Sequence, residues 1–363
     1  MSLNMRLFFD ARYITTGFHD GISRYSAELG SALSRITPVT FIISAKSQLS
    51  KLPKNSKYIL IHPPTSTKEP FTATVLNKYK PDVVFSPMQT MGALGRKFKL
   101  ILTVHDLIYY RHRMPPQSLR PAIRVGWRMY HMSYAPQRLA LNAADMVATV
   151  SQTSKYQIEQ VKLTHHPIVV VPNAPRDLSS FIEKTPVTKD IKNLVYMGSF
   201  MPYKNVETLI AGMEFLPEFT LHLLSRISPK RQKELTKKLP NKSQVVFHNG
   251  TSDEEYAQLL IDNALLVTAS LDEGYGLPIA EAAALGTPAV ISDLEVFHEV
   301  AGKGALYFNP KSPQDFADKV IKASSKEEYV ELVKEAKNHI KNFSWDKSAH
   351  ILLDAIKHLV HNE

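Results

Sequence analysis

The stretch Leu271-Asp-Glu-Gly-Tyr-Gly-Leu-Pro-Ile-Ala-Glu281 lies between two short apolar runs, residues 264–270 and 288–292. Both runs have the length and composition of β-strands. Pro278 suits the first position of a helix, because its missing N–H costs nothing there, and Gly286 suits the helix end. The segment therefore predicts a strand, a glycine loop, a short helix and a second strand, the unit from which parallel α/β sheets are built.

The start of this helix predicts an anion site. Gly274 and Gly276 carry no side chain that would block a ligand, and the amides of Gly276 and Leu277 point toward the crevice above the sheet. The helix dipole there favours a diphosphate. Glu281 falls early in an otherwise apolar helix, where ribose hydroxyls would satisfy its carboxylate, and Glu273 lies one loop earlier. Taken singly, Glu281 could be an acid favoured by the dipole and Glu273 a solvated loop charge.

The pair of glutamates resembles the Glu-x7-Glu motif of the retaining, GT-B-fold glycosyltransferases of family 4 (glycosyl transferases group 1). The usual family form is Glu-Gly-Phe-Gly-Leu-Pro-x-x-Glu-Ala, and Tyr275 here replaces the Phe. The resemblance implies a metal-independent enzyme with no cofactor that uses a nucleotide-diphosphate sugar as substrate. It also implies a catalytic role for Glu273 and donor-binding roles for Gly274, Tyr275, Gly276, Leu277 and Glu281.

Short apolar runs recur along the chain and alternate with helical segments, which predicts doubly wound parallel sheets. The runs fall into two series, separated by a polar, proline-containing stretch at residues 173–190: residues 5–10, 39–44, 58–62, 83–86, 100–104, 146–150 and 169–172, then 193–197, 220–224, 245–247, 265–268, 289–291 and 305–308. We expect an acceptor-binding Rossmann-like domain over 1–175 and a nucleotide-sugar-binding one over 176–345. The resemblance implies that the two domains face across a cleft and that a last helix, 346–363, crosses back to the first domain.

A second motif, Gly198-Ser-Phe-Met-Pro-Tyr-Lys-Asn205, follows the first strand of the second series and so lies at a strand's carboxyl end, where open sheets bind ligands. Lys204 resembles the family's catalytic phosphate-binding lysine, whose ammonium would stabilise the departing diphosphate. A solvated loop lysine is the alternative. Relatives carry an arginine near Ser199 or Tyr203, so Arg226 is a candidate second cation. The family segment that meets the base corresponds to His248, Gly250 and Thr251.

The first domain offers fewer matches to the family. His105-Asp106 follows a strand and resembles the His-Asp that the family often has there. A histidine at a strand's carboxyl end could donate a hydrogen bond to a sugar hydroxyl or shuttle a proton, with a structural histidine as the alternative. Gly21 matches one glycine of the family's N-terminal glycine loop, near the donor diphosphate. Asp10 and Arg12 resemble the Asp-Ala-Arg opening of some mannosyltransferase-like members, so Arg12 and Asp106 are acceptor candidates; a turn pair is the alternative for Asp10 and Arg12.

Charge is distributed unevenly along the chain. Residues 1–180 hold 23 Lys and Arg against 9 Asp and Glu, whereas the remainder holds 21 against 25. Arg120, Arg124 and Arg128 are spaced by four, so on a helix they form one stripe. The stripe could be a solvated face, or it could attract an anionic membrane surface or a phosphorylated lipid acceptor. No nucleic-acid-binding module is recognisable, so we expect no nucleic-acid partner.

The composition excludes several classes of protein. There is no cysteine, hence no disulfide scaffold or thiol nucleophile, and no apolar stretch of roughly 20 residues, so we expect a cytoplasmic protein, peripheral at most on the inner face of the cell membrane. No Asp-x-Asp occurs, which argues against metal-dependent glycosyltransferases, and no metal site is expected.

The sequence therefore favours a retaining hexosyltransferase that moves a sugar from a GDP- or UDP-sugar to a saccharide or lipid-linked acceptor in surface polysaccharide biosynthesis. The N-terminal pattern points toward GDP-mannose. A GT-B-fold epimerase or phosphorylase, and a non-enzymatic basic surface-binding protein, are the alternatives. The base, the sugar, the acceptor and the oligomeric state are left open.

Overall fold

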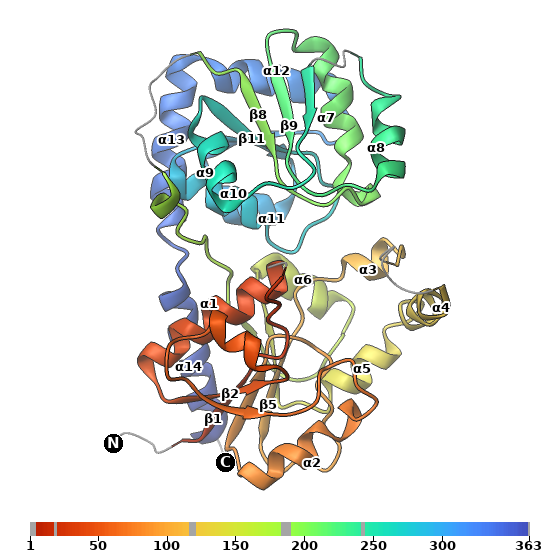
Figure 1. The fold of residues 1–363 in the computed structure, drawn as a ribbon, viewed down its shortest axis with the longest axis vertical. Coiled ribbons are helices and arrows are strands. Elements are labelled where there is room, and N and C mark those ends of the chain that lie inside the picture. The colour runs from red at the N-terminus through yellow and green to blue at the C-terminus, as the bar shows by residue number, and fades with distance from the viewer. Residues whose placement is uncertain (1–4, 18–19, 116–120, 183–189, 241–243, 362–363) are drawn as a thin grey trace. The chain divides into compact units, whose positions relative to one another are not determined.

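A computed structural model of the chain, drawn in Figure 1, describes residues 5–17, 20–115, 121–182, 190–240 and 244–361. The chain divides into two compact units. The N-terminal unit comprises residues 1–173 and 344–363, and the C-terminal unit comprises residues 174–343. The boundaries expected from the sequence, 175/176 and 345/346, lie two residues further along the chain.

The N-terminal unit is built on a seven-stranded sheet of order β3-β2-β1-β4-β5-β6-β7, in which every pairing is parallel. Its strands are β1 (Leu7–Asp10), β2 (Val39–Ile43), β3 (Lys57–Leu60), β4 (Val83–Ser86), β5 (Lys99–Thr103), β6 (Met146–Thr149) and β7 (Ile168–Val170). Its helices are α1 (Gly21–Ile36), α2 (Thr72–Leu76), α3 (Ile108–Arg111), α4 (Pro121–Tyr130), α5 (Ala135–Leu141), α6 (Gln152–Gln160) and α14 (Trp345–His361).

The C-terminal unit repeats this plan with six parallel strands in the order β10-β9-β8-β11-β12-β13. The strands are β8 (Asn193–Tyr196), β9 (Thr220–Leu223), β10 (Val245–Phe247), β11 (Ala264–Thr268), β12 (Ala289–Ser292) and β13 (Ala305–Phe308). The helices are α7 (Val206–Gly212), α8 (Pro229–Thr236), α9 (Asp253–Ile261), α10 (Leu277–Leu285), α11 (Glu295–Ala301), α12 (Pro313–Ser324) and α13 (Lys326–Ile340).

Short 3-10 helices lie in the connections between these elements. They are η1 (Lys46–Lys51), η2 (Glu69–Phe71), η3 (Asn77–Tyr79), η4 (Ser179–Phe181), η5 (Pro202–Lys204) and η6 (Met213–Phe215). The candidate Lys204 lies in η5, and η2 contains Glu69, which contacts the candidate Arg12.

Local sequence accounts for many helix ends. Asp20 caps α1 by accepting a hydrogen bond from the Ser23 amide at 2.8 Å. Ser252 and Glu255 form a reciprocal capping box at the start of α9. Strand residues such as Leu100 and Leu265 are fully buried, because helices cover both faces of a parallel sheet. The prediction of two doubly wound parallel-sheet domains is confirmed.

The last helix belongs to the N-terminal unit, although it follows the C-terminal unit in sequence. It packs against α1 through a buried face that includes Ala349, Leu352 and Ile356. The Ser348 hydroxyl donates a hydrogen bond to the Pro172 carbonyl oxygen at 2.7 Å. The N-terminal unit is therefore closed by a segment that lies far away in sequence.

Candidate functional site

In each sheet the strand order reverses at one point, and ligands of open α/β sheets bind beyond the carboxyl ends of the strands at that point. In the C-terminal unit the reversal lies between β8 and β11. Lys204 ends the 3-10 turn after β8, and Glu273 follows β11. The topology therefore places the two candidate catalytic residues of this unit at its ligand-binding edge.

Lys204 and Glu273 contact each other directly. The Lys204 ammonium forms an ion pair with Oε1 of Glu273, and the two side chains are only 16% and 14% exposed. The Ser270 hydroxyl donates a second hydrogen bond to the same carboxylate oxygen at 2.9 Å. One cation and one carboxylate are therefore held in place at the carboxyl edge of the sheet.

The loops that carry this pair are joined by hydrogen bonds. Asn205 adopts a left-handed backbone with φ of 52°. Its side-chain Nδ2 donates hydrogen bonds to the carbonyl oxygens of Ala269 and Pro310 at 3.1 and 2.7 Å. The Leu271 amide donates to the Tyr203 carbonyl oxygen at 2.7 Å. Because both loops are held by the same contacts, the ion pair lies on a preorganised frame.

The glycine turn after Glu273 begins α10. Gly276 has a φ of 108°, and a Cβ there would lie 3.0 Å from the Phe297 ring, so the turn requires glycine. Leu277 is the first helical residue and Pro278 the second, one position later than expected. Gly274 precedes the turn. The turn joins Glu273 to the first residues of α10, so the start of this helix, where an anion can bind, follows the ion pair directly in the chain.

Tyr275, between the two glycines, faces the core. Its side chain is buried, its ring lies edge-on to Phe343 with centroids 6.0 Å apart, and burial raises the pKa of its phenol. Because the ring packs into the core, a donor-binding role of Tyr275 would be carried by its backbone.

Glu281 is buried and paired with a residue that the sequence analysis missed. Its side chain is 2% exposed, and its Oε1 accepts a hydrogen bond from Arg176 Nε at 2.7 Å. Arg176 also pairs with Asp253 at 2.5 Å, and its guanidinium lies 5.7 Å from the centre of the Tyr256 ring. The only sequence signal for Arg176 is a lone cation after the last strand of the first series, in a stretch that resembles a linker.

The residues expected near the base follow β10. His248 Nε2 lies 3.0 Å from Nδ1 of His222, and burial lowers the pKa of both rings. Gly250 has a φ of 109°, and a Cβ there would lie 3.1 Å from Arg226 Cγ, so Arg226 borders this segment.

Ser199 and Thr251 complete the set expected around the donor. Ser199 is exposed, and its carbonyl oxygen accepts from the Tyr196 hydroxyl at 2.7 Å. Thr251 Oγ1 is buried without a hydrogen-bond partner among the described residues. Both residues lie in loops at the carboxyl ends of strands, as the sequence suggested.

In the N-terminal unit, His105 follows β5. Its Nε2 lies 2.8 Å from the Pro87 carbonyl oxygen, so Nε2 carries the proton, and Nδ1 is the acceptor nitrogen of the neutral ring. Burial lowers the pKa of His105, although the Pro87 carbonyl and Asp20 oppose the shift. The neutral ring can accept a hydrogen bond from a sugar hydroxyl, rather than donate one as the sequence suggested.

Two further candidates of this unit are Asp106, which directly follows His105 in the chain, and Gly21. An oxygen of Asp106 accepts from the Ile108 amide at 2.9 Å, at the start of α3. Gly21 is the exposed first residue of α1, next to the cap Asp20. Neither residue is shown with a ligand, so their expected roles stay predictions.

The structure corrects the acceptor role that the sequence suggested for Arg12. Its guanidinium is fully buried and forms bidentate hydrogen bonds with both Asp10 (2.8 and 3.0 Å) and Glu69 (2.7 and 2.9 Å). A further N–H points to the His62 carbonyl oxygen at 3.3 Å. Because these bonds use every donor of the side chain, Arg12 stabilises the loop after β1 and does not face an acceptor.

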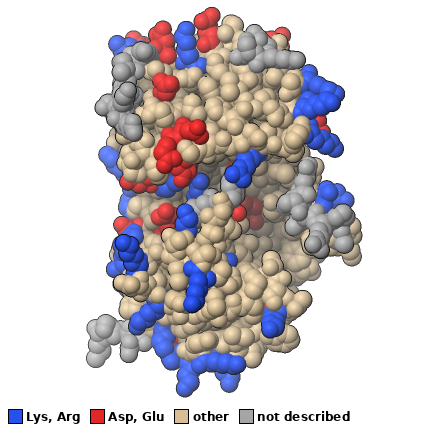
Figure 2. Space-filling view, viewed as in Figure 1, with Lys and Arg blue, Asp and Glu red and all other residues tan. Residues whose placement is uncertain are grey.

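Two of the three arginines of the stripe lie in the described part of the chain. Arg120 lies outside the described residues; Arg124 is half-buried and Arg128 is exposed on α4. The inner face of α4 is aromatic, with the Trp127 and His131 rings stacked at 4.0 Å. On the face drawn in Figure 2, Lys and Arg side chains are spread over the N-terminal unit with few acids among them.

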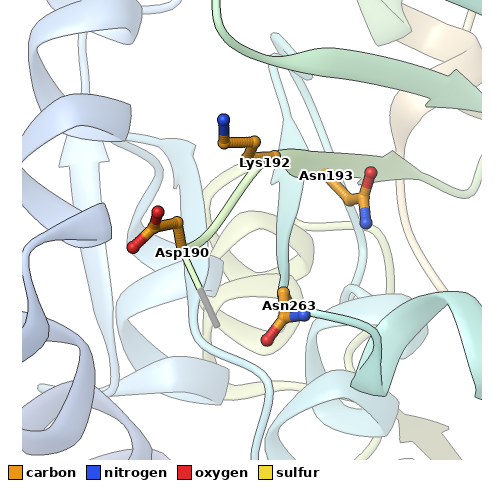
Figure 3. A pocket seen from close by; sticks show the side chains of 4 residues that line it. All are labelled: Asp190, Lys192, Asn193 and Asn263. Atoms are coloured by element: carbon orange, nitrogen blue, oxygen red, sulfur yellow. The ribbon is translucent and has the colours of Figure 1, made fainter. Parts of the chain in front are cut away.

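A separate hollow lies at the opposite edge of the second sheet. Figure 3 shows it lined by Asp190, Lys192, Asn193 and Asn263, which lead into β8 and β11 at their amino ends. It is therefore remote from the Lys204–Glu273 edge. Within the described ranges, no group of three or more His, Asp or Glu side chains is placed to hold a metal ion. No described helix is long and apolar enough to cross a membrane.

Comparison with known proteins agrees with this arrangement. Residues 20–174 match the family described as Glycosyltransferase Family 4, and residues 177–342 match Glycosyl transferases group 1. The O-antigen chain mannosyltransferase RfbU of Salmonella typhimurium is 26% identical over 252 residues, covering 68% of this chain and 65% of that protein. The serotype-specific mannosyltransferase WbdA of Escherichia coli is 24% identical over 283 residues, 72% of this chain and 34% of that one.

The chain thus spans about two thirds of the first relative and one third of the second. Among solved structures, HepE from Anabaena in complex with UDP-glucose superposes with a TM-score of 0.70 at 16% identity, covering 98% of this chain and 100% of that one. Because the two family matches account for nearly the whole described fold, the chain belongs to the GT-B-fold glycosyltransferases of family 4, the glycosyl transferases group 1.

Proposed function

We propose that the protein is a retaining hexosyltransferase that moves a sugar from a nucleotide-diphosphate sugar to a saccharide or lipid-linked acceptor. The observation that carries the proposal is the Lys204–Glu273 ion pair at the strand-order reversal, beside the glycine start of α10. The names of the relatives, an O-antigen chain mannosyltransferase and a serotype-specific mannosyltransferase, support a role in surface polysaccharide biosynthesis and favour GDP-mannose as the donor. The UDP-glucose bound to HepE supports a nucleotide-sugar donor in general.

In this proposal the donor lies along the carboxyl edge of the second sheet. The diphosphate meets the backbone amides at the start of α10, and the ribose hydroxyls donate to Glu281. Glu273 accepts hydrogen bonds from the hydroxyls of the transferred sugar. Lys204 stabilises the leaving diphosphate, which gains negative charge in the transition state, so a bound metal is not required.

The transfer step breaks the bond between the sugar C1 and the phosphate oxygen and forms a bond between C1 and the acceptor oxygen on the same face. The leaving phosphate accepts the proton of the acceptor hydroxyl. His105 serves as a hydrogen-bond acceptor for a sugar hydroxyl through Nδ1, because its Nε2 proton is directed at Pro87.

The first test is a screen of UDP- and GDP-sugars by thermal shift and calorimetry, followed by determination of the anomeric configuration of the product by NMR. Retention of configuration, and turnover that persists in EDTA, are expected. Absence of nucleotide binding would rule out the proposal. An epimerase would convert the donor without an acceptor, and a phosphorylase would depend on inorganic phosphate.

A membrane surface is proposed as the partner of the N-terminal unit. The outward face of α4 and its end carries Val125, Met129 and Met132, which are 57%, 67% and 67% exposed, beside the exposed Arg128. Apolar side chains that are bordered by cations suit the interface of an anionic bilayer, where each cation adds about 1 kcal/mol. The protein would then lie peripherally on the inner face of the cell membrane.

Sedimentation with vesicles tests this partner. Binding to vesicles with anionic lipid is expected to fall in a Met129→Ser, Met132→Ser variant and to persist in Val330→Ser, which alters an apolar side chain of the C-terminal unit that is 59% exposed. If Arg124→Ala abolished function while Lys204→Ala and Glu273→Ala had no effect, the chain would be a basic surface-binding protein and not an enzyme.

A further inference from the structure

The Glu281 carboxylate lies in an unusual place. Its side chain is 2% exposed, and it belongs to a helix whose other residues are all apolar. A buried carboxylate is costly unless it is paired with a cation and hydrogen-bonded. Arg176 supplies the pairing cation, through a bond of 2.7 Å from Nε to Oε1.

Arg176 is itself held firmly by α9. Its Nη1 atom contacts Asp253 at 2.5 Å, and its guanidinium carbon lies 5.7 Å from the centre of the Tyr256 ring. A guanidinium is planar and presents its N–H groups in a fixed fork, so contacts on two edges and one face define its orientation. The orientation of Arg176 in turn defines the plane of the Glu281 carboxylate.

We propose that Arg176 is a positioning residue for nucleotide recognition: it holds the buried Glu281 carboxylate aligned to accept the hydroxyls of the nucleotide ribose. This inference rests on the proposed function, which places the ribose at Glu281. It adds a residue from the segment between the two strand series, two positions after the first residue of the C-terminal unit. A lysine could supply the charge but not the fork that bridges two carboxylates.

The test compares the dissociation constants of UDP and GDP with those of 2′-deoxy-UDP and 2′-deoxy-GDP by calorimetry. The wild-type protein is expected to prefer the ribonucleotide by roughly tenfold or more, the worth of a hydrogen bond to a charged acceptor. The preference should fall to within about twofold in Glu281→Gln and in Arg176→Met, and to an intermediate value in Arg176→Lys. The double variant should match Glu281→Gln, because both changes act on one interaction.

If the role of Arg176 were purely structural, its replacement would weaken the binding of both nucleotides equally. The ratio of their dissociation constants would then be unchanged. Glu254→Gln, which removes an exposed charge from the same turn of α9, is the matched control and should keep the wild-type ratio. If the ratio collapses in Glu281→Gln but not in the Arg176 variants, the inference is overturned and the donor site stands. If it persists in Glu281→Gln, the ribose role of Glu281 is wrong, and the inference falls with it. Should Arg176→Met fail to fold, Arg176→Lys carries the same comparison.

Discussion

Replacing Lys204 by methionine tests the candidate site most directly, because the change removes the charge and keeps most of the side-chain volume. In the unliganded protein it leaves Glu273 with the Ser270 hydroxyl and without its cation. Breaking a fully buried pair costs ~3–5 kcal/mol, and an exposed pair contributes less than ~1 kcal/mol. With side chains 16% and 14% exposed and one hydrogen bond retained, we expect a loss of about 1–3 kcal/mol in the free energy of unfolding.

For a unit of this size each kcal/mol corresponds to about 2–4 °C in Tm, so the melting temperature should fall by roughly 2–12 °C. The catalytic effect should be larger. Loss of a group that stabilises charge only in the transition state lowers kcat by ~10²–10³-fold. Initial rates of nucleoside diphosphate release, measured beside thermal unfolding with and without UDP or GDP, give both quantities from one protein preparation.

Lys192→Met is the matched control, because Lys192 precedes β8 at the opposite edge of the same sheet. Its side chain is 57% exposed and pairs with Glu218 at 3.7 Å, so the change should cost no more than about 0.5 kcal/mol and leave kcat unaltered. A folded Lys204→Met protein whose kcat lies within tenfold of the wild-type value, or that the nucleotide still stabilises to the same degree, would refute the role given to Lys204.

Three further changes probe other parts of the fold. Gly276 has a φ of 108°, and a Cβ there would lie against the Phe297 ring. Gly276→Ala should therefore lower the free energy of unfolding by about 1–3 kcal/mol and weaken nucleotide binding. Unchanged stability in denaturation and unchanged affinity in calorimetry would contradict the geometry of the turn. Arg12→Met should cost ~3–5 kcal/mol in urea unfolding, because it leaves the carboxylates of Asp10 and Glu69 unpaired, and a stable variant would show that the network is dispensable. Burial lowers the pKa of His105 in the folded protein. Below pH ~6.5 this histidine is therefore protonated more readily in the unfolded chain than in the folded protein. The free energy of unfolding should fall as the pH is lowered, by up to ~1.4 kcal/mol per pH unit. His105→Gln keeps a donor for Pro87 but cannot titrate, so between pH 7.5 and 5.5 it should lose less stability than the wild type; equal losses would mean that His105 titrates normally.

The sequence alone determined the elements and several of the site residues. Alternating apolar runs predicted all the strands of both sheets, because the periodicity that buries a parallel strand is local in the chain. The glycine turn and the spacing of Glu273 and Glu281 are also local, and they identified the start of α10 as a ligand site. Lys204 was identified by its resemblance to the family's phosphate-binding lysine, in a motif that directly follows a strand.

Only the tertiary structure decided which side chains meet. Lys204 and Glu273 are 69 residues apart, and Arg176 and Glu281 are 105 apart; strand order and loop packing, which no local pattern specifies, bring each pair together. Arg12 was an acceptor candidate in the sequence, but the fold places Glu69, 57 residues away, beside it in the interior. Tyr275 stands in a ligand motif, yet its ring is buried against Phe343. Burial and ion pairing arise from contacts between distant segments, so the chemistry of Lys204, Arg176, Arg12 and Tyr275 follows from the packed fold.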